Sequence, residues 1–319
     1  TGDAAPHLYD PAIGRIWTAN ARSIDDPAAL AAIGGEDAGL GAQYVLGARA
    51  RQIRDALLGL DGDAAPGDML HIQLDDRAVF LTRWRDFMLK LLDESALAGR
   101  PARAEMRRLV ARWDARAGVD SVGYRLVRAF HDRTEGAAWR MILRSFGIED
   151  EPPAPLQFER ALWTLVTRQP PNWLGAEYPS WRAFLLEQID AAAMSLSRRC
   201  GALSRCRWGA AHPAHIRNPV SRAIPSLSGL IDLPTIQLPG DHDMPRVQDG
   251  AFGASERFAV SPGHEDRGYL ELPGGQTDHP LSPFYRAGFN AWAHGEAAAF
   301  LPGKAEHRLL LQPAGGALN

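Results

Sequence analysis

The sequence lacks any long run of apolar residues. Its longest apolar stretches, such as Ala78–Leu81, are soon interrupted by charge, whereas a membrane-spanning helix needs about 18 consecutive apolar residues. An excess of charge of one sign is also lacking, because 35 Lys plus Arg oppose 38 Asp plus Glu for a net charge of −3. The chain therefore has no overall positive field that would attract a polyanion. We therefore expect neither a membrane span nor a nucleic-acid partner.

Cysteine is scarce, with only Cys200 and Cys206 in the whole chain. Two thiols cannot complete a zinc site by themselves, and their spacing fits neither a CxxC pair nor a zinc ribbon. Two interpretations stay open at this point. The cysteines form a local disulfide in an oxidising compartment, or both are reduced and structural.

What is present is the composition of an ordinary globular protein. Hydrophobic residues make up 45% and charged residues 23% of the 319 residues, which excludes wholesale disorder. This length suits two ordinary domains or one large one, at about 150 residues per domain. Because the chain starts at Thr1 with no initiator Met and no apolar signal core, we expect Thr1 to be a cut end.

The residue pattern divides the chain into three segments. Residues 1–46 are interrupted by Gly and Pro, and only Arg15–Ala19 indicates a strand. Residues 47–200 show helical periodicity, and residues 201–319 return to loops and short β-prone pieces. Helices are expected at about 48–62, 80–91, 102–116, 122–133, 156–167 and 180–197, and strands at 235–238, 257–260 and 308–311. This order indicates an α+β chain.

Several short motifs could carry chemistry on their own. His212 and His215 form an HxxH with Asp-His-Asp at 241–243 downstream, but this Pro-interrupted stretch lacks the helical frame of a zinc motif. Loop histidines are therefore favoured over a metal site. Ser226 and Ser228 lie in Pro-Ser-Leu-Ser-Gly, where proline replaces the first glycine of a serine-nucleophile elbow.

The function of two further features, Thr1 and the loop at 274–283, stays open. A free N-terminal Thr1 could act as a nucleophile with its own α-amine as base, although any fragment must begin somewhere. The string Gly-Gly-Gln-Thr-Asp-His-Pro-Leu-Ser-Pro at 274–283 is an ordered, Gly-turned loop. It has no lysine and no capped helix behind it, so it does not fit a phosphate cradle.

Seven segments in this order resemble the penicillin acylase (penicillin amidase) family of N-terminal nucleophile hydrolases. They include a strand ending in Ala-Asn, an Arg-x-Arg-x-Ile helix start and an Ile-Gln-Leu-Asp segment. The segments are 14–20, 47–53, 72–75, 207–209, 225–227, 240–241 and 274–285, with Trp292 and Gly295 behind the last. Together they cover almost the whole chain.

The resemblance implies an αββα hydrolase core, to which 1–46 and 201–319 contribute, with 47–200 as a mainly helical subdomain. It also implies hydrolysis of an acyl-amide bond by the N-terminal serine of a self-cleaved β subunit. We expect that serine upstream of this chain, because only nineteen residues precede Asn20. The chain then resembles the C-terminal portion of the β subunit, inactive alone, with the missing part of the β subunit and an α subunit as partners.

Two functional residues carry over from the family by position. Asn20 matches the asparagine whose side-chain amide donates to the oxyanion of the tetrahedral intermediate. Arg49 matches an arginine that braces this site, since a guanidinium offers five donors in a fixed fork. Arg51 is the competing assignment for that arginine. The amide substrate stays open among penicillins, cephalosporin side chains and acyl-homoserine lactones.

The resemblance has further implications outside the catalytic step. It implies no cofactor for catalysis but a structural calcium, for which Asp37 in the Gly-rich loop is a candidate ligand. It implies a periplasmic or secreted location, which favours pairing of Cys200 with Cys206. The alternative function is a non-catalytic binding module on the same scaffold, with its pocket kept and its nucleophile lost.

Overall fold

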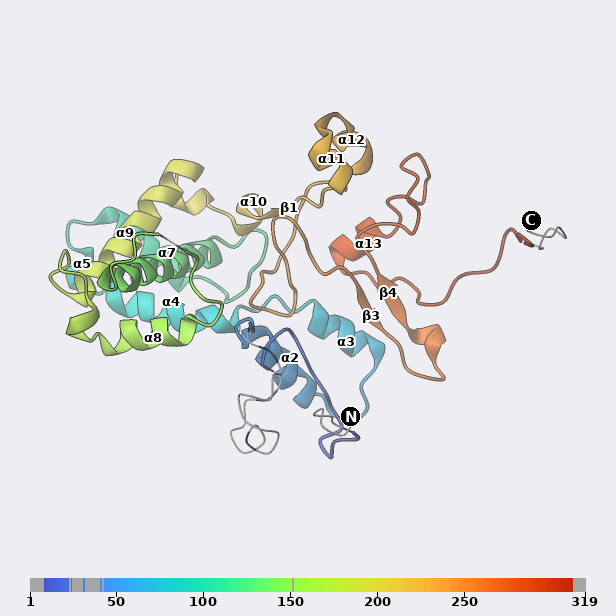
Figure 1. The fold of residues 1–319 in the computed structure, drawn as a ribbon, viewed down its shortest axis with the longest axis horizontal. Coiled ribbons are helices and arrows are strands. Elements are labelled where there is room, and N and C mark those ends of the chain that lie inside the picture. The colour runs from blue at the N-terminus through green and yellow to red at the C-terminus, as the bar shows by residue number, and fades with distance from the viewer. Residues whose placement is uncertain are drawn as a thin grey trace.

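A computed structural model describes residues 9–22, 24, 31, 41, 43–150 and 152–311. The helices of residues 79–200 (α4 to α9) gather in one lobe, the few strands lie with shorter helices in a second region, and the helices of residues 48–73 (α2 and α3) lie between the two (Figure 1). The chain is therefore α+β, as expected. The described part up to residue 200 contains α2 (Ala48–Leu58), α3 (Pro66–Gln73), α4 (Val79–Leu91), α5 (Glu94–Leu97), α6 (Pro101–Ala111), α7 (Val122–Ser145), α8 (Glu159–Arg168), η3 (Pro171–Trp173) and α9 (Trp181–Cys200).

The remaining described residues form short elements. The helical ones are η4 (Leu203–Arg205), α10 (Trp208–Ala211), α11 (Pro219–Ala223), η5 (Pro225–Leu227), α12 (Ser228–Ile231), η6 (Glu265–Arg267) and α13 (Phe289–His294). Strand β1 (Pro213–Ala214) pairs antiparallel with β2 (Ile236–Gln237), and β3 (Arg257–Ala259) pairs antiparallel with β4 (Tyr269–Glu271). These are two separate two-stranded ribbons.

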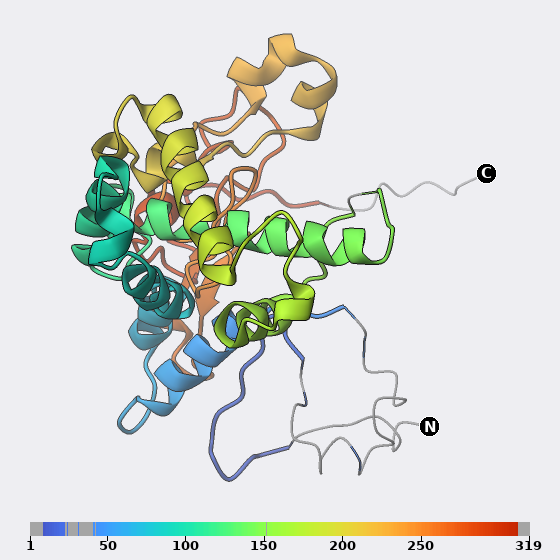
Figure 2. The same ribbon diagram turned by 90° about the vertical axis from the view of Figure 1, so that its left-hand side faces the viewer.

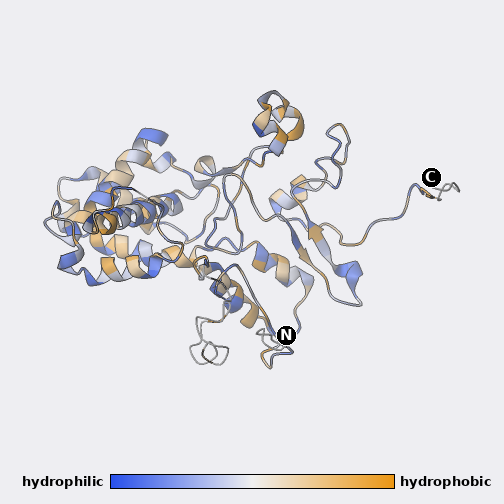
Figure 3. Ribbon diagram, in the orientation of Figure 1, coloured by the Kyte–Doolittle hydropathy of each residue, from blue (hydrophilic) through white to orange (hydrophobic). Residues whose placement is uncertain are grey.

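The main hydrophobic core lies between α4, α6, α7 and α9, and the long α7 passes behind α9 in the turned view (Figure 2). These helices carry polar and apolar residues side by side (Figure 3), and the apolar ones, including Trp84 and Phe130, are fully buried. Ser121 caps α7 by accepting from the Tyr124 amide, and Gly123 lets this helix end approach Trp113, because a Cβ there would lie 2.2 Å from the Trp113 Cβ.

A smaller second core surrounds Trp292 of α13. Helix α3 packs against β3. Gln73 at the end of α3 donates to the Phe258 carbonyl at 3.1 Å and accepts from the Tyr269 hydroxyl at 2.9 Å. A buried ion pair of Arg257 with Glu271, at 2.7 Å, closes the ribbon. None of the helices among the residues described combines the length and apolar character of a membrane span.

All six predicted helices are present, but α2 ends at Leu58 rather than near 62, and α6 ends at Ala111 rather than near 116. Helix α7 continues to Ser145 rather than ending near 133, since residues on its inner face stay buried beyond that point. Helix α3 was not predicted from the sequence, although Pro66 at its first position suits a helix start. The β-prone pieces at 235–238 and 257–260 contain β2 and β3.

Two predicted strands are wrong. Arg15–Ala19 and residues 308–311 adopt no strand structure, because no strand of the described chain lies beside them to share hydrogen bonds. Ile16 is 62% exposed and Leu310 is 73% exposed, and the end of the described chain extends away from the body (Figure 1). The αββα layers and the divisions at 46 and 200 stay predictions.

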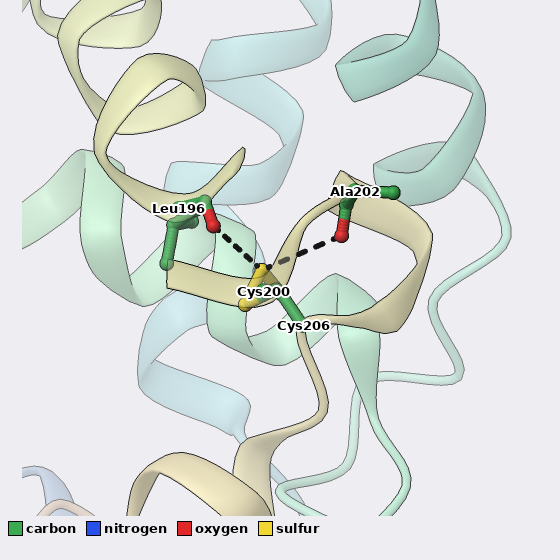
Figure 4. The surroundings of a disulfide bond; sticks show 4 residues. All are labelled: Leu196, Cys200, Ala202 and Cys206. Carbon is green, nitrogen blue, oxygen red and sulfur yellow. Dashed lines mark hydrogen bonds between the residues drawn. A yellow bond between two sulfur atoms is a disulfide. The ribbon is translucent and has the colours of Figure 1, made fainter. Parts of the chain in front are cut away.

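Cys200 and Cys206 form a disulfide, which decides between the two interpretations of the pair. The bond links the last residue of α9 to the turn after η4, with 5.4 Å between the two Cα atoms (Figure 4). The Sγ of Cys206 is buried 3.3 Å from the carbonyl oxygen of Leu196. The disulfide therefore fixes the C-terminal end of α9 on the main core.

Candidate functional site

Asn20 adopts a left-handed backbone conformation beside the start of α2. Its φ is 59°, a region that asparagine tolerates better than most residues. Its carbonyl oxygen accepts from the Val45 amide at 3.1 Å. This link and the packing of Arg22 over the Tyr44 ring bring two loop segments of the chain together beside α2.

Arg49, at the beginning of α2, holds Asn20 in place. Its Nη2 donates to the Ala19 carbonyl oxygen at 3.0 Å and to Asn20 Oδ1 at 2.5 Å. Arg51 is exposed on the same helix, so of the two candidates it is Arg49 that contacts Asn20. Burial lowers the pKa of Arg49, and the nearby carboxylate of Asp243 opposes this shift.

The contact with Arg49 orients the Asn20 carboxamide. A carboxamide has an acceptor oxygen and a donor nitrogen at opposite corners, and here the oxygen is occupied by the guanidinium. Asn20 Nδ2 has no acceptor among the described residues. Because Asn20 also lines a cavity, its N–H group is available to a ligand there.

The cavity beside Asn20 and Arg49 has a volume of about 450 Å³. Part of its wall is apolar and comes from four regions of the chain: Val45, Leu46, Phe80, Leu156, Val247 and Phe252. The rest is charged or titratable: Arg49, Arg128, His131, Glu135, Glu159, His242 and Asp243. This size and mixed lining suit a small organic ligand with an apolar part and a polar part.

His131, a buried histidine of α7, lines this cavity. His131 Nε2 lies 2.8 Å from Glu159 Oε2, and its Nδ1 lies 3.0 Å from Asp132 Oδ1. Burial alone would lower the pKa of His131, but the hydrogen bonds to Asp132 and Glu159 raise it to about 9. Glu159 also accepts from Trp84 Nε1 at 2.9 Å and pairs with Arg83. A protonated imidazole thus joins α7 to α8.

Two other charged groups of the cavity differ in their partners. Arg128 donates to Asp243 at 2.7 Å, so this pair is neutralised. Glu135, in contrast, forms no ion pair or hydrogen bond with the described residues. Burial raises the pKa of its carboxyl group.

The Ile-Gln-Leu-Asp segment contributes support for the site that the sequence analysis did not identify. Asp75, which is 7% exposed, accepts from the Arg77 guanidinium and from Gln52 Nε2 at 2.8 Å. Gln52 is buried on α2, one turn after Arg49, and this contact therefore anchors the helix that carries Arg49. The signal in the sequence was the carboxylate two residues after the end of α3.

Of the isolated motifs, only the Asp-His-Asp at 241–243 reaches this site, where His242 and Asp243 line the cavity. His212 stacks on Trp208 at 4.5 Å between ring centroids, and His215 is exposed. Ser226 and Ser228 lie on short helical turns rather than after a strand. Thr1 and Asp37 lie outside the described residues. Within the described ranges, no group of three or more His, Cys, Asp or Glu side chains could hold a metal.

The Gly-Gly-Gln loop is a closed turn that does not line the Asn20 cavity. The Gly275 amide donates to the Tyr285 carbonyl at 2.9 Å, and a Cβ at Gly275 would lie 1.5 Å from the Phe284 carbonyl oxygen. Only glycine fits this approach. The Tyr285 hydroxyl in turn donates to the Ile231 carbonyl at 2.7 Å. These contacts give the loop a structural role.

An amide donor held by arginine at a mixed cavity suits the stabilisation of an oxyanion. The penicillin amidase family model matches residues 1–307, and the chain belongs to this family. This match confirms the resemblance found in the seven segments.

One relative is the penicillin acylase 2 proenzyme of Pseudomonas sp. (strain SE83). It is 23% identical to this chain over 300 residues, which cover 89% of the chain and 36% of that protein. The chain thus spans about a third of the length of this relative.

Proposed function

We propose that this chain is part of an acylase that hydrolyses an acyl-amide bond, with the N-terminal serine nucleophile supplied from outside the chain. Family membership over residues 1–307 supports the reaction class. The relative's name describes a proenzyme, which supports maturation by cleavage into the nucleophile-bearing form. The chain alone should be inactive.

In the proposed reaction, the serine hydroxyl attacks the amide carbon and its own α-amine accepts the proton. The carbonyl oxygen then carries a negative charge, to which Asn20 Nδ2 donates a hydrogen bond. Collapse of the intermediate breaks the carbon–nitrogen bond as the proton passes to the leaving amine. Water hydrolyses the acyl-enzyme ester by the same steps. The hydrogen bond from Arg49 to Asn20 Oδ1 is the observation that carries this assignment.

The remaining proposals concern the protein as a whole. The partners are the missing part of the β subunit and an α subunit, and a structural calcium would have Asp37 among its ligands. The location is periplasmic or secreted, which the Cys200–Cys206 disulfide supports. The substrate is a small N-acyl compound, since the cavity has both apolar and charged walls.

The test is the substitution Asn20→Ala in the complete processed enzyme, assayed on penicillins, cephalosporins and acyl-homoserine lactones. Loss of one oxyanion donor should lower kcat by about 100- to 1,000-fold. Asn172→Ala is the matched control, because Asn172 is exposed on η3 and does not line the cavity. It should leave kcat unchanged.

Two outcomes would contradict the proposal. One is a kcat for Asn20→Ala within about twofold of the parent. The other is a complete β subunit that begins with a residue other than serine, which would favour the non-catalytic binding module. N-terminal sequencing of the native protein distinguishes the two functions directly.

A further inference from the structure

A second cavity, of about 420 Å³, lies between α7 and α9. Helix α7 lines it with residues 125, 128, 129, 132 and 133, a spacing that places them on one helix face. Helix α9 contributes residues 192, 195, 196 and 199 from the opposite side. It shares Arg128 and His242 with the cavity beside Asn20, but neither Asn20 nor Arg49 lines it. We call it the α7–α9 groove.

The carboxylates of the groove already have donors. Asp241 accepts from the Tyr124 hydroxyl and the His242 amide, and Arg128 lies beside it. Asp132 pairs with Arg128 at 3.2 Å and with His131. Asp249 accepts from the Ala251 amide at 3.0 Å.

Three arginines of the groove, in contrast, have no carboxylate within ion-pair distance among the described residues: Arg125, Arg133 and Arg199. Arg125 is half buried, and its Nε is a buried donor with no partner in that part of the chain. A donor left in this state costs free energy that a bound acceptor would recover. The groove therefore has cationic donors in excess.

The position of Arg125 along α7 adds to the positive potential of the groove. Arg125 lies in the first turn of α7, behind its Ser121 cap, where the helix presents its partly positive end and no acidic residue. Burial lowers the pKa of Arg125, the positive charge of Arg199 lowers it further, and Asp132 opposes this. The two guanidinium groups therefore repel each other, and Asp132 compensates this only in part.

We propose that the α7–α9 groove binds a small oxyanion, a phosphate, sulfate or carboxylate group, between Arg125 and Arg199. Planar guanidinium forks match two oxygens of such a group and hold it by charge-assisted hydrogen bonds. The disulfide at Cys200 fixes the helix end next to Arg199. Arg133, exposed on the same face of α7, adds a third positive charge.

Binding is tested on the full chain by thermal unfolding in sodium phosphate and in sodium acetate, each against sodium chloride of equal ionic strength. Phosphate and acetate distinguish a tetrahedral from a planar anion. We expect at least one of them to raise Tm more than chloride does. Arg125→Gln and Arg199→Gln should each weaken the apparent affinity about tenfold.

Arg198→Gln is the matched control, because Arg198 is exposed on the same helix turn but does not line the groove. It removes the same charge and should keep the parent response. Since Arg199 is exposed, Arg199→Gln should fold even if Arg125→Gln does not. The proposal is overturned if neither anion exceeds chloride, or if Arg199→Gln responds as the parent does.

Discussion

At the residue scale, the site depends on two side chains that sequence patterns alone could not join. Asn20 and Arg49 lie in a loop and at a helix start, and no periodicity links residues 29 positions apart. Their assignment came from family motifs, and the structure shows their contact. Periodicity also gave no sign of the contact between Gln52 and Asp75. Helix prediction follows apolar residues, and both of these buried residues are polar.

The contact of Asp75 with Gln52 gives a prediction at this scale. Asp75→Ala leaves the Gln52 amide and the Arg77 guanidinium without their buried acceptor, which should cost about 2–4 kcal/mol of unfolding free energy. Because α2 carries Arg49, the kcat of the assembled enzyme should fall as well. Urea unfolding and steady-state kinetics measure the two effects.

The control for this variant is Asp61→Ala, on the exposed loop after α2. It should change neither quantity. If Asp75→Ala unfolds at the same urea concentration as the parent, the anchoring role of Asp75 is wrong.

At the element scale, the long helices were predictable, whereas only two of the four predicted strands are present. The helices of the main core repeat apolar residues over ten or more positions, so their signal is local. The strands are two or three residues long and exist only where another segment pairs with them. Arg15–Ala19 has β-prone residues but no pairing partner in the described chain, which is why its prediction failed.

The contact of His131 on α7 with Glu159 on α8 predicts that the stability of the fold depends on pH. The pKa of His131 is about 9 in the folded chain, above its ordinary value of about 6.5. The proton therefore stabilises the folded state, with the full effect below about pH 6.5 and a loss as pH rises through about 9. The unfolding free energy should fall by about 3 kcal/mol over this interval.

Urea unfolding at several pH values measures this slope. His131→Gln should be less stable at neutral pH but should lose much of the decline, whereas His294→Gln, on an exposed helix end, should retain it. An identical slope in His131→Gln and the parent would show that His131 is not the group responsible.

The disulfide at the end of α9 gives a second prediction for an element. A bond that closes such a short loop stabilises a protein by about 2 kcal/mol. Reduction should therefore lower the urea midpoint of the parent chain. The double variant Cys200→Ala/Cys206→Ala should unfold near the reduced midpoint and should not respond to a reductant. A parent midpoint unaffected by complete reduction would contradict this.

At the scale of the whole molecule, the helical lobe and the strand region meet at the cavity. Its lining includes Asn20 and α2 from the N-terminal part of the chain, α7 and α8 from the helical lobe, and residues 242–252 from the second region. A cavity assembled from such distant segments has no local sequence signal. The layered hydrolase core needs strand partners beyond the short ribbons described, so sequence and structure leave that prediction open.

The central claim is that the Asn20 amide binds a developing oxyanion. It is tested most directly with a boronic acid that carries the acyl group of the best substrate, since its adduct with serine places a tetrahedral oxygen in that position. The account predicts that Asn20→Ala weakens boronate binding by the same factor, about 100-fold or more, as it lowers kcat/KM. Unchanged boronate affinity in Asn20→Ala, measured with intact enzyme, would contradict the account.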